Sequence, residues 1–290
     1  MQETNITRRG FLRAAALGGL GAVSAAAGYA NLIEPTSYEL TETDIFIRDL
    51  PEGFDGFRIA QVSDVHHSRL VPIDEVQRVV QITMGAKPDL IALTGDYTTS
   101  RRRYIEPCAE ALGALAAPAG VWAVLGNHDH YTDPELTRRA LARAGINVLD
   151  NANTVLRRGS DTLQLAGIGD WSWAANDWGR ATHGLDLKRP SVLLSHQPGV
   201  LDLPEARGFS LIISGHTHGG QISVPLFGPP ARLINPREFR YIRGYYRREE
   251  TQLYVSRGTG VIGLPVRFGA RPEIAVLRLR RAPGSKDKSL

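Results

Sequence analysis

Short apolar runs recur along this chain, and polar or glycine-rich stretches separate them. Short continuous apolar runs are typical of β-strands that are covered on both faces by other layers of structure. On this basis we predict strands at residues 57–62, 90–93, 121–125, 163–166, 192–194, 211–213, 253–255 and 274–277.

Two of the intervening segments have the spacing of amphipathic helices. One begins at Pro72, and the other begins at the capping pair Asp133-Pro134 and ends at Gly145. The buried face of the first is marked by Ile73, Val76, Val80 and Met84. Strands that alternate with helices predict an α/β fold in which helices cover sheet layers.

The first thirty residues differ from everything that follows. Arg8 and Arg9 precede a run at 14–27 made almost wholly of Ala, Gly, Leu and Val, and three alanines at 25–27 suit a signal peptidase. This arrangement resembles a twin-arginine (Tat) export signal, which would make the export machinery a partner. The run is glycine-rich and shorter than the ~20 strongly apolar residues of a membrane span. If it stays uncleaved, it could still act as a loose anchor.

These boundaries divide the chain into four parts: a signal or N-terminal anchor at 1–30, a polar connector at 31–44, one folded domain at 45–280, and a disordered tail at 281–290. An apolar content of 42% and a charged content of 22% are ordinary for a globular protein. The net charge of +4 suits anionic substrates without indicating specific nucleic-acid binding. Cys108 is the only cysteine, so an intrachain disulfide and a thiolate metal cluster are both excluded.

Five polar motifs directly follow predicted strands. They are Asp64-Val65-His66, Gly95-Asp96, Gly126-Asn127-His128-Asp129, Ser195-His196 and Gly215-His216-Thr217-His218. Ligands of open α/β sheets gather at the carboxyl ends of strands, so we expect the five loops to converge on one site. Each motif alone is common by chance, but five in order, all rich in metal-ligand residue types, predict a metal centre.

The ligand types indicate which metals bind and how many. Carboxylate, imidazole and amide oxygen without thiolate favour Mn, Fe, Co or Zn. Two aspartates, one asparagine and four histidines, before His128 is counted, exceed what one ion needs. A carboxylate can bridge two cations, and such a pair clamps the attacking and leaving oxygens of a phosphoryl transfer. The residues therefore predict a two-metal site that acts on a phosphate ester.

This ordered set of motifs resembles the calcineurin-like metallophosphoesterases, and the string at 215–221 is similar to a bacterial branch often exported by the twin-arginine route. Residues 254–258 and 265–269 are also similar to that branch, and the resemblance spans residues 58–279. It implies an α/β sandwich of two mixed β-sheets flanked by helices.

The resemblance also implies roles for individual residues. Asp64, His66 and His218 would hold the first of two divalent ions, Asn127, His196 and His216 the second, and Asp96 would bridge them. His128, oriented by Asp129, would stay off the metals as a general acid or transition-state stabiliser. A metal-bridging hydroxide would attack phosphorus in line.

Other residues carry weaker signals. Three further histidines match no ligand position and are interpreted as loop residues: His67, His130 and His183. Tryptophans 171, 173 and 178 are expected to pack in the core or in loops, although one of them could form a wall of the site. Arg257 and Arg267 either contact substrate phosphate or form surface salt bridges. The basic and aromatic stretch at 225–248 is interpreted as a solvated hairpin, with anionic lipid or a cell-wall polymer as the alternative ligand.

We therefore expect a phosphoesterase that hydrolyses a phosphomonoester or phosphodiester in the periplasm, in the cell wall or at the outer face of the cytoplasmic membrane. One alternative is a membrane-surface hydrolase of a lipid-linked or glycolipid phosphate. Another is a non-catalytic wall protein that binds metal or polyanion. His128 and Asp129 argue against the last, because a pure binding site needs no acid beside its metals.

Overall fold

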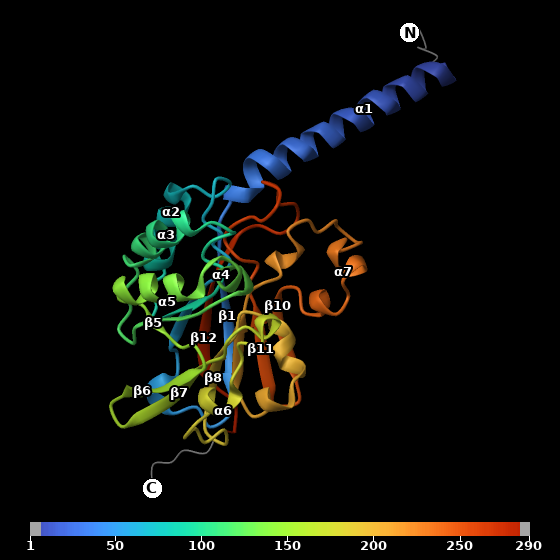
Figure 1. Cartoon of the computed structure of the whole chain (residues 1–290). Coiled ribbons are helices and arrows are strands. Elements are labelled where there is room, and N and C mark those ends of the chain that lie inside the picture. Colours follow the sequence, from blue (N-terminus) through green and yellow to red (C-terminus); the bar gives the residue numbers. More distant parts are fainter. Residues whose placement is uncertain (1–6, 285–290) are drawn as a thin grey trace.

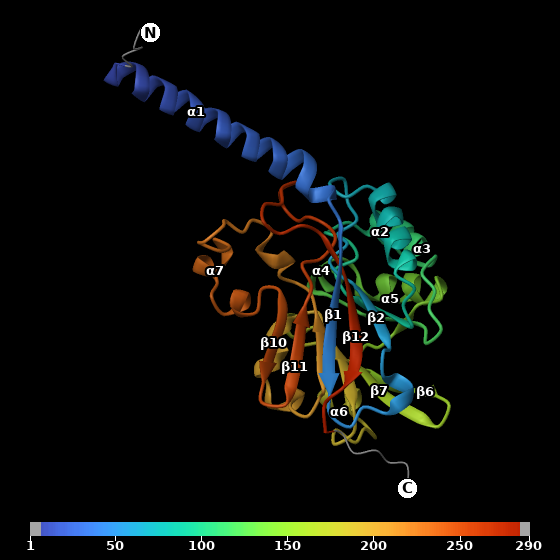
Figure 2. The ribbon, with the colours of Figure 1, turned by 180° about the vertical axis from the view of Figure 1, so that it is seen from behind.

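A computed structural model of the chain describes residues 7–284. In this part of the chain two six-stranded β-sheets face each other, and helices cover their outer faces (Figures 1 and 2). The predicted α/β sandwich of two mixed sheets is thereby confirmed.

The first sheet is mixed, because its strand β12 runs antiparallel to β2 while the other neighbouring pairs are parallel. In spatial order its strands are β1 (Glu39–Ile47), β12 (Glu273–Arg281), β2 (Arg58–Val62), β3 (Leu90–Thr94), β4 (Val121–Val124) and β5 (Asn147–Val148).

The second sheet has four parallel strands between two antiparallel edges. In spatial order its strands are β10 (Gly244–Arg248), β11 (Thr251–Val255), β9 (Leu211–Ser214), β8 (Ser191–Leu194), β7 (Asp161–Gly167) and β6 (Ala152–Arg158). All the predicted strands are present in the two sheets.

Alternate side chains of the central strands enter different cores, which explains the continuous apolar runs. In β3, Leu90 and Ala92 pack between the two sheets, whereas Ile91 and Leu93 pack against α2 (Ile73–Gly85), α3 (Ile105–Leu112) and α5 (Pro134–Arg143). On the outer face of the second sheet, Leu193 of β8 and Ile212 of β9 pack with residues that include Ala181 of the short helix α6 (Trp178–Ala181).

The two predicted helices begin at the expected capping residues. The Asp133 side chain accepts a hydrogen bond from the backbone N–H of Leu136 at 2.9 Å, and α5 ends before Gly145, whose φ is 81°. In α2, Val76 and Val80 are buried as predicted, while Ile73 and Met84 are only partly buried. Cys108 in α3 is also buried.

The connector expected at 31–44 is wrong in its second part. Residues 39–44 belong to β1, which pairs in parallel with β12 along its whole length. The expected tail starts one residue too early, because Arg281 is the last residue of β12. Residues 285–290 of that tail lie outside the described residues.

The N-terminal segment forms a long helix that projects from the body of the protein (Figures 1 and 2). Helix α1 (Arg8–Gly28) continues through a π-helical turn (Tyr29–Ile33) and a 3-10 turn (Glu34–Thr36). Among residues 7–284 this segment is the one helix long and apolar enough to cross a membrane, and none of its apolar window is buried. The helical segment is longer than the apolar run at 14–27 suggests. A signal sequence near the N-terminus also has this length and apolar composition.

Candidate metal centre

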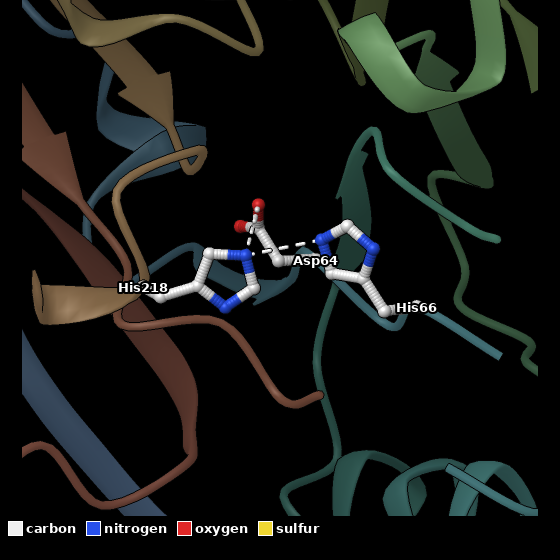
Figure 3. A group of neighbouring side chains, drawn as sticks. All are labelled: Asp64, His66 and His218. Atoms are coloured by element: carbon white, nitrogen blue, oxygen red, sulfur yellow. Dashed lines mark hydrogen bonds and ion pairs between the residues drawn. The ribbon is translucent and has the colours of Figure 1, made fainter. Parts of the chain in front are cut away.

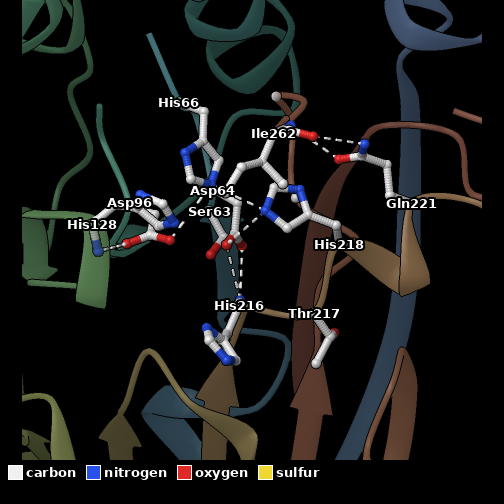
Figure 4. A network of polar contacts seen from close by, with 12 residues as sticks. Ser63, Asp64, His66, Asp96, His128, His216, Thr217, His218, Gln221 and Ile262 are labelled. Atoms are coloured by element: carbon white, nitrogen blue, oxygen red, sulfur yellow. Dashed lines mark hydrogen bonds and ion pairs between the residues drawn. The ribbon is translucent and has the colours of Figure 1, made fainter. Parts of the chain in front are cut away.

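The five motif loops follow β2, β3, β4, β8 and β9 and meet at one edge of the sandwich, as predicted. Figure 4 shows side chains from the loops after β2, β3, β4 and β9. Carboxylate and imidazole atoms from these loops approach within 4.8 Å of one another in three overlapping groups. The structure brings together all the predicted ligands: Asp64, His66, Asp96, Asn127, His196, His216 and His218.

The first cluster joins the loop after β2 to the loop after β9 (Figure 3). His66 Nε2 lies 3.0 Å from His218 Nε2, and the two rings are stacked with centroids 4.8 Å apart. Asp64 Oδ1 lies 3.6 Å from His218 Nε2. All three residues are buried.

The second cluster centres on the side-chain oxygen of Asn127, the first residue of α4 (Asn127–Thr132). This Oδ1 lies 3.0 Å from His196 Nε2 and 3.0 Å from His216 Nδ1. The two histidine nitrogens are 3.2 Å apart. Three atoms with lone pairs therefore converge on one point.

Asp96 lies between the two clusters. Its Oδ2 is 3.4 Å from His66 Nε2 and 3.2 Å from His196 Nε2, while its Oδ1 accepts a hydrogen bond from the backbone N–H of His128 at 2.8 Å. One carboxylate thus reaches both clusters, which is the position that a bridging ligand requires.

The loops hold these side chains at the cost of backbone strain. Positive φ angles, which cost non-glycine residues about 1–3 kcal/mol each, occur at five ligands. They are Asp64, His66, Asp96, His216 and His218, with φ between 51° and 74°. Glycines make room beside the carboxylates, because a Cβ at Gly126 would lie 2.2 Å from Asp96 Oδ1 and one at Gly215 would lie 2.3 Å from Asp64 Oδ2.

The electrostatics of the cluster fit bound cations. Burial lowers the pKa of His66 and of His218 to about 3, so both rings are neutral, which is the form that binds metal. Burial alone would lower the pKa of His196, but the Asp96 carboxylate raises it to about 10. A proton on His196 thus balances the buried negative charge of Asp96, which a bound cation would otherwise balance. The Nδ1 atom of His218 is buried without a hydrogen-bond partner, and buried charges such as Asp64 are normally paired or bound to metal.

His128 forms one of the three groups together with His66 and Asp96, and its predicted orientation by Asp129 is wrong. Its Nδ1 hydrogen-bonds to the carbonyl oxygen of Thr99 at 2.6 Å. The Asp129 carboxylate instead accepts hydrogen bonds from three backbone N–H groups, those of Asp96, Tyr97 and Gly126, at 2.8–3.0 Å. Burial and the charge of Asp96 raise the pKa of Asp129 to about 7, although the three donors favour its ionised form. Asp129 therefore braces the loop that carries Asp96.

A pocket of about 240 Å³ opens beside the second cluster. Its lining includes His216, Trp171, Ser172, Asn235, Arg237 and Glu238. Trp171 is thus the tryptophan that forms a wall, while Trp178 packs against the outer core of the second sheet. Glu238 was not predicted, yet its Oε1 lies 2.7 Å from His216 Nε2. A signal was present, since Glu238 is the only acidic residue in the arginine-rich stretch 225–248.

The two candidate arginines, Arg257 and Arg267, are not among the residues that line this pocket. Arg267 is fully buried, and its guanidinium donates to backbone carbonyls that include those of Gly260 and Ala270 at 3.0 and 2.7 Å. Burial lowers its pKa to about 10. Arg257 forms ion pairs with Glu273 and Glu39 at 3.2 and 2.8 Å; Glu273 is buried, whereas Glu39 is 39% exposed.

The remaining histidines lie outside the ligand groups, as interpreted, although His130 belongs to a helix rather than to a loop. His67 is buried and hydrogen-bonds through Nδ1 to the carbonyl oxygen of Val71 at 2.9 Å. His130 is partly buried in α4, and His183 is exposed near β6. None of the three belongs to the ligand groups found among residues 7–284.

In the stretch 225–248, the part from 244 onward is a hairpin strand, β10, paired with β11. Arg240 and Arg248 both form ion pairs with Asp202, and Arg247 pairs with Glu250. These intrachain pairs favour the solvated-hairpin interpretation for this part.

Comparison with known proteins gives consistent matches. The calcineurin-like phosphoesterase family matches residues 57–220. The uncharacterized metallophosphoesterase YkuE of Bacillus subtilis is 36% identical over 95% of this chain and 98% of its own length. The phosphodiesterase YaeI of Escherichia coli is 33% identical over 94% of this chain and 99% of its own.

Two matches come from Danio rerio. A transmembrane protein with a metallophosphoesterase domain is 34% identical over 90% of this chain, which spans 61% of that protein. The crystal structure of a dimetal phosphatase covers 71% of this chain and 88% of its own, with a TM-score of 0.45 and 11% identity.

Proposed function

This chain belongs to the calcineurin-like metallophosphoesterases, which makes it a hydrolase of phosphoester bonds, and we propose from that premise that it works with two divalent metal ions. The observation that carries the proposal is the position of Asp96, whose Oδ2 lies within 3.4 Å of a histidine nitrogen in each cluster. A single-metal enzyme would need no carboxylate shared by two sets of ligands.

The residues divide into two sets around that carboxylate. Asp64, His66 and His218 would hold one ion, and Asn127, His196 and His216 the other. Bound cations of this kind lower the pKa of a water molecule and neutralise phosphoryl oxygens. The chain's own contribution is to hold the imidazole and carboxylate side chains in fixed positions, which the strained loops and adjacent glycines achieve.

We assign the leaving-group proton to His128. The hydrogen bond from its Nδ1–H to the Thr99 carbonyl oxygen fixes the ring and leaves Nε2 as the atom that gains or loses a proton. A protonated His128 would donate from Nε2 to the departing oxygen. Asp129 acts through the Asp96 loop and is a positioning residue.

The pocket beside His216 is where we place the substrate. Arg237 supplies positive charge at its lining and Trp171 an aromatic wall. A relative that is named a phosphodiesterase supports a phosphodiester as the substrate, with a phosphomonoester as the alternative. Family membership makes the chain a hydrolase, which argues against a non-catalytic wall protein.

Metal analysis together with kinetics tests the proposal. Protein stripped of metal should be inactive. Addition of Mn, Fe, Co or Zn alone should restore hydrolysis of a phosphodiester or phosphomonoester. Activity should reach its maximum when two ions are bound per chain. Asp96→Asn should lower the occupancy of at least one site. Two tightly held ions in that variant, or one ion per chain in the fully active wild type, would refute the bridging role.

The twin-arginine motif supports a location outside the cytoplasm, in the periplasm, in the cell wall or at the outer face of the cytoplasmic membrane. The projecting, unburied α1 is compatible with a signal that is cleaved and with one that stays as an anchor.

A further inference from the structure

Large apolar side chains are exposed together in the segment that follows the His216–His218 motif. Leu226, Phe227, Leu233 and Ile234 are between 86% and 103% exposed, the last two in the short helix α7 (Ala231–Ile234). Leu264, in a neighbouring loop, is 60% exposed. Gathered apolar residues of this kind mark an interaction site, whereas single exposed ones are ordinary.

The loop that carries Leu264 connects this segment to the base of α1. The Gln221 side chain donates to the carbonyl oxygen of Ile262 at 2.9 Å, which ties the loop to the start of the segment. The backbone N–H of Arg267 donates to the carbonyl oxygen of Ala30 at 2.9 Å, which ties the same loop to the base of α1. In both overall views, α7 lies on the side of the protein toward which α1 points (Figures 1 and 2).

Helix α1 indicates what covers this surface. It is apolar, unburied and long enough to cross a bilayer, and Leu32 and Ile33 at its base are 76% and 53% exposed. Arg232 and Arg237 flank the apolar residues, and no ion pair holds either of them within residues 7–284. Basic residues beside an apolar surface suit the anionic headgroups of a membrane.

We propose that Leu226, Phe227, Leu233, Ile234 and Leu264 form a membrane-docking surface, which inserts into the interfacial layer of the bilayer that α1 enters. Asn235, Arg237 and Glu238 directly follow this surface and line the pocket beside His216. Docking therefore brings the pocket to the level of the lipid headgroups. The substrate class that fits is a phosphoester whose apolar part stays in the bilayer, an extension that rests on the proposed phosphoesterase function.

Site-specific fluorescence tests the docking without any use of activity. Cys108 is the only cysteine and is buried, so a cysteine introduced at the surface can be labelled selectively. We would label Phe227→Cys and Leu233→Cys in the full chain, with Ser160→Cys in the exposed turn between β6 and β7 as the control. The chains would be reconstituted in phosphatidylglycerol–phosphatidylcholine vesicles that contain a lipid-attached quencher.

We expect strong quenching at 227 and 233 and little at 160. Equal quenching at all three positions while the chain remains vesicle-bound would overturn the proposal. A spectral change at 227 and 233 that needs no vesicles and rises with protein concentration would also overturn it, because the surface would then bind a second copy of the chain.

Kinetics test the substrate class separately. Serine at positions 227, 233 and 234 together should leave hydrolysis of a water-soluble ester unchanged and lower hydrolysis of a phospholipid in vesicles at least tenfold. An equal effect on the two substrates would overturn the substrate class. If the metal-loaded wild type hydrolysed neither substrate, the proposed function would fail, whereas the quenching result would still decide the docking.

Discussion

His216, in the second cluster, is held through both of its ring nitrogens. Nδ1 faces Asn127 Oδ1 at 3.0 Å, and Nε2 faces Glu238 Oε1 at 2.7 Å. A carboxylate on the outer nitrogen of a ligating histidine fixes its tautomer and raises its basicity. Glu238 is accordingly a positioning residue for the metal that His216 would bind.

Replacing Glu238 should therefore weaken metal binding without removing a ligand. For Glu238→Gln we expect the affinity of one of the two sites to fall about 10- to 100-fold, which is typical of losing such a partner. Metal titration followed by calorimetry measures this, with Glu249→Gln at an exposed turn as the matched control. If Glu238→Gln binds both ions as tightly as the control, the contact with His216 has no role in metal binding.

His128 should be separable from the ligands by its dependence on the leaving group. His128→Ala should keep both metals and lose about 10²- to 10⁴-fold in rate on an alkyl phosphate ester, whose leaving alkoxide needs a proton. A nitrophenyl ester needs that proton far less and should be affected much less.

His216→Ala is the matched comparison, because it should lose metal and slow both esters alike. Metal content and both rates would be measured side by side for the two variants. Loss of metal from His128→Ala, or equal slowing of both esters, would make His128 a ligand or an electrostatic stabiliser instead.

At the residue scale, sequence reasoning selected the candidate ligands that the structure brings together, because each belongs to a short motif at the end of a strand. It missed the Thr99 carbonyl oxygen beside His128, since any residue type offers a backbone oxygen. It also assigned Asp129 to its neighbour in sequence, whereas α4 turns that side chain toward the backbone of Asp96.

At the scale of elements, an ion-pair network joins β1, β12 and the loop after β11. Arg257 pairs with Glu39 of β1 and Glu273 of β12, and Glu273 also accepts a hydrogen bond from the Tyr254 hydroxyl at 2.8 Å. Burial raises the pKa of Glu273, but the charge of Arg257 and hydrogen bonds outweigh it, so the net pKa is below the usual value.

This lowered pKa predicts how stability depends on pH. Glu273 stabilises the fold above its unfolded pKa of about 4.3, and the contribution disappears as the pH falls through the lower folded pKa. Glu273→Gln should thus cost on the order of 1–3 kcal/mol at pH 7 and less below about pH 4. Thermal unfolding of both proteins between pH 7 and 3.5 measures the difference, and a gap that is constant across this range would contradict the assignment.

The elements that sequence reasoning missed are those at sheet edges. In β1, Ile45 and Ile47 are buried, whereas Leu40 and Phe46 are 43% and 52% exposed, so its apolar residues fall on both faces and do not mark one buried face. β10 is a short strand of glycine, tyrosines and arginines. Central strands were predictable because both of their faces are buried, whereas edge strands are specified by pairing with strands distant in sequence.

At the scale of the whole molecule, we propose that the N-terminal helix determines where the enzyme works. If Arg8 and Arg9 form a twin-arginine signal, replacing both with lysine should trap the protein inside the cell. Fractionation and immunoblotting measure this, with Arg13→Lys as the control for an equivalent change nearby. Export of the double variant at the wild-type level would show that the twin-arginine interpretation is wrong.

The sandwich could be predicted as a whole because strands, helices and motifs alternate in one order that a known family shares. The placement of α1 and of the exposed apolar segment could not be predicted. Both depend on the loop at 260–270, whose contacts join residues far apart in the chain.

The attachment of the α1 base also limits how the chain can be matured by proteolysis. Glu34 is 1% exposed, and its carboxylate accepts a hydrogen bond from the backbone N–H of Ala270 at 2.8 Å. Four residues earlier in the chain, the Ala30 carbonyl oxygen accepts a hydrogen bond from the backbone N–H of Arg267. Cleavage after Ala27 would leave both contacts intact. Trimming beyond Glu34 would leave the backbone N–H groups of Arg267 and Ala270 without their acceptors. Both belong to the loop in which the N–H of Gly260 donates to the carbonyl oxygen of Asp64. A mature N-terminus therefore has to lie upstream of Ala30 for the catalytic edge to keep its support.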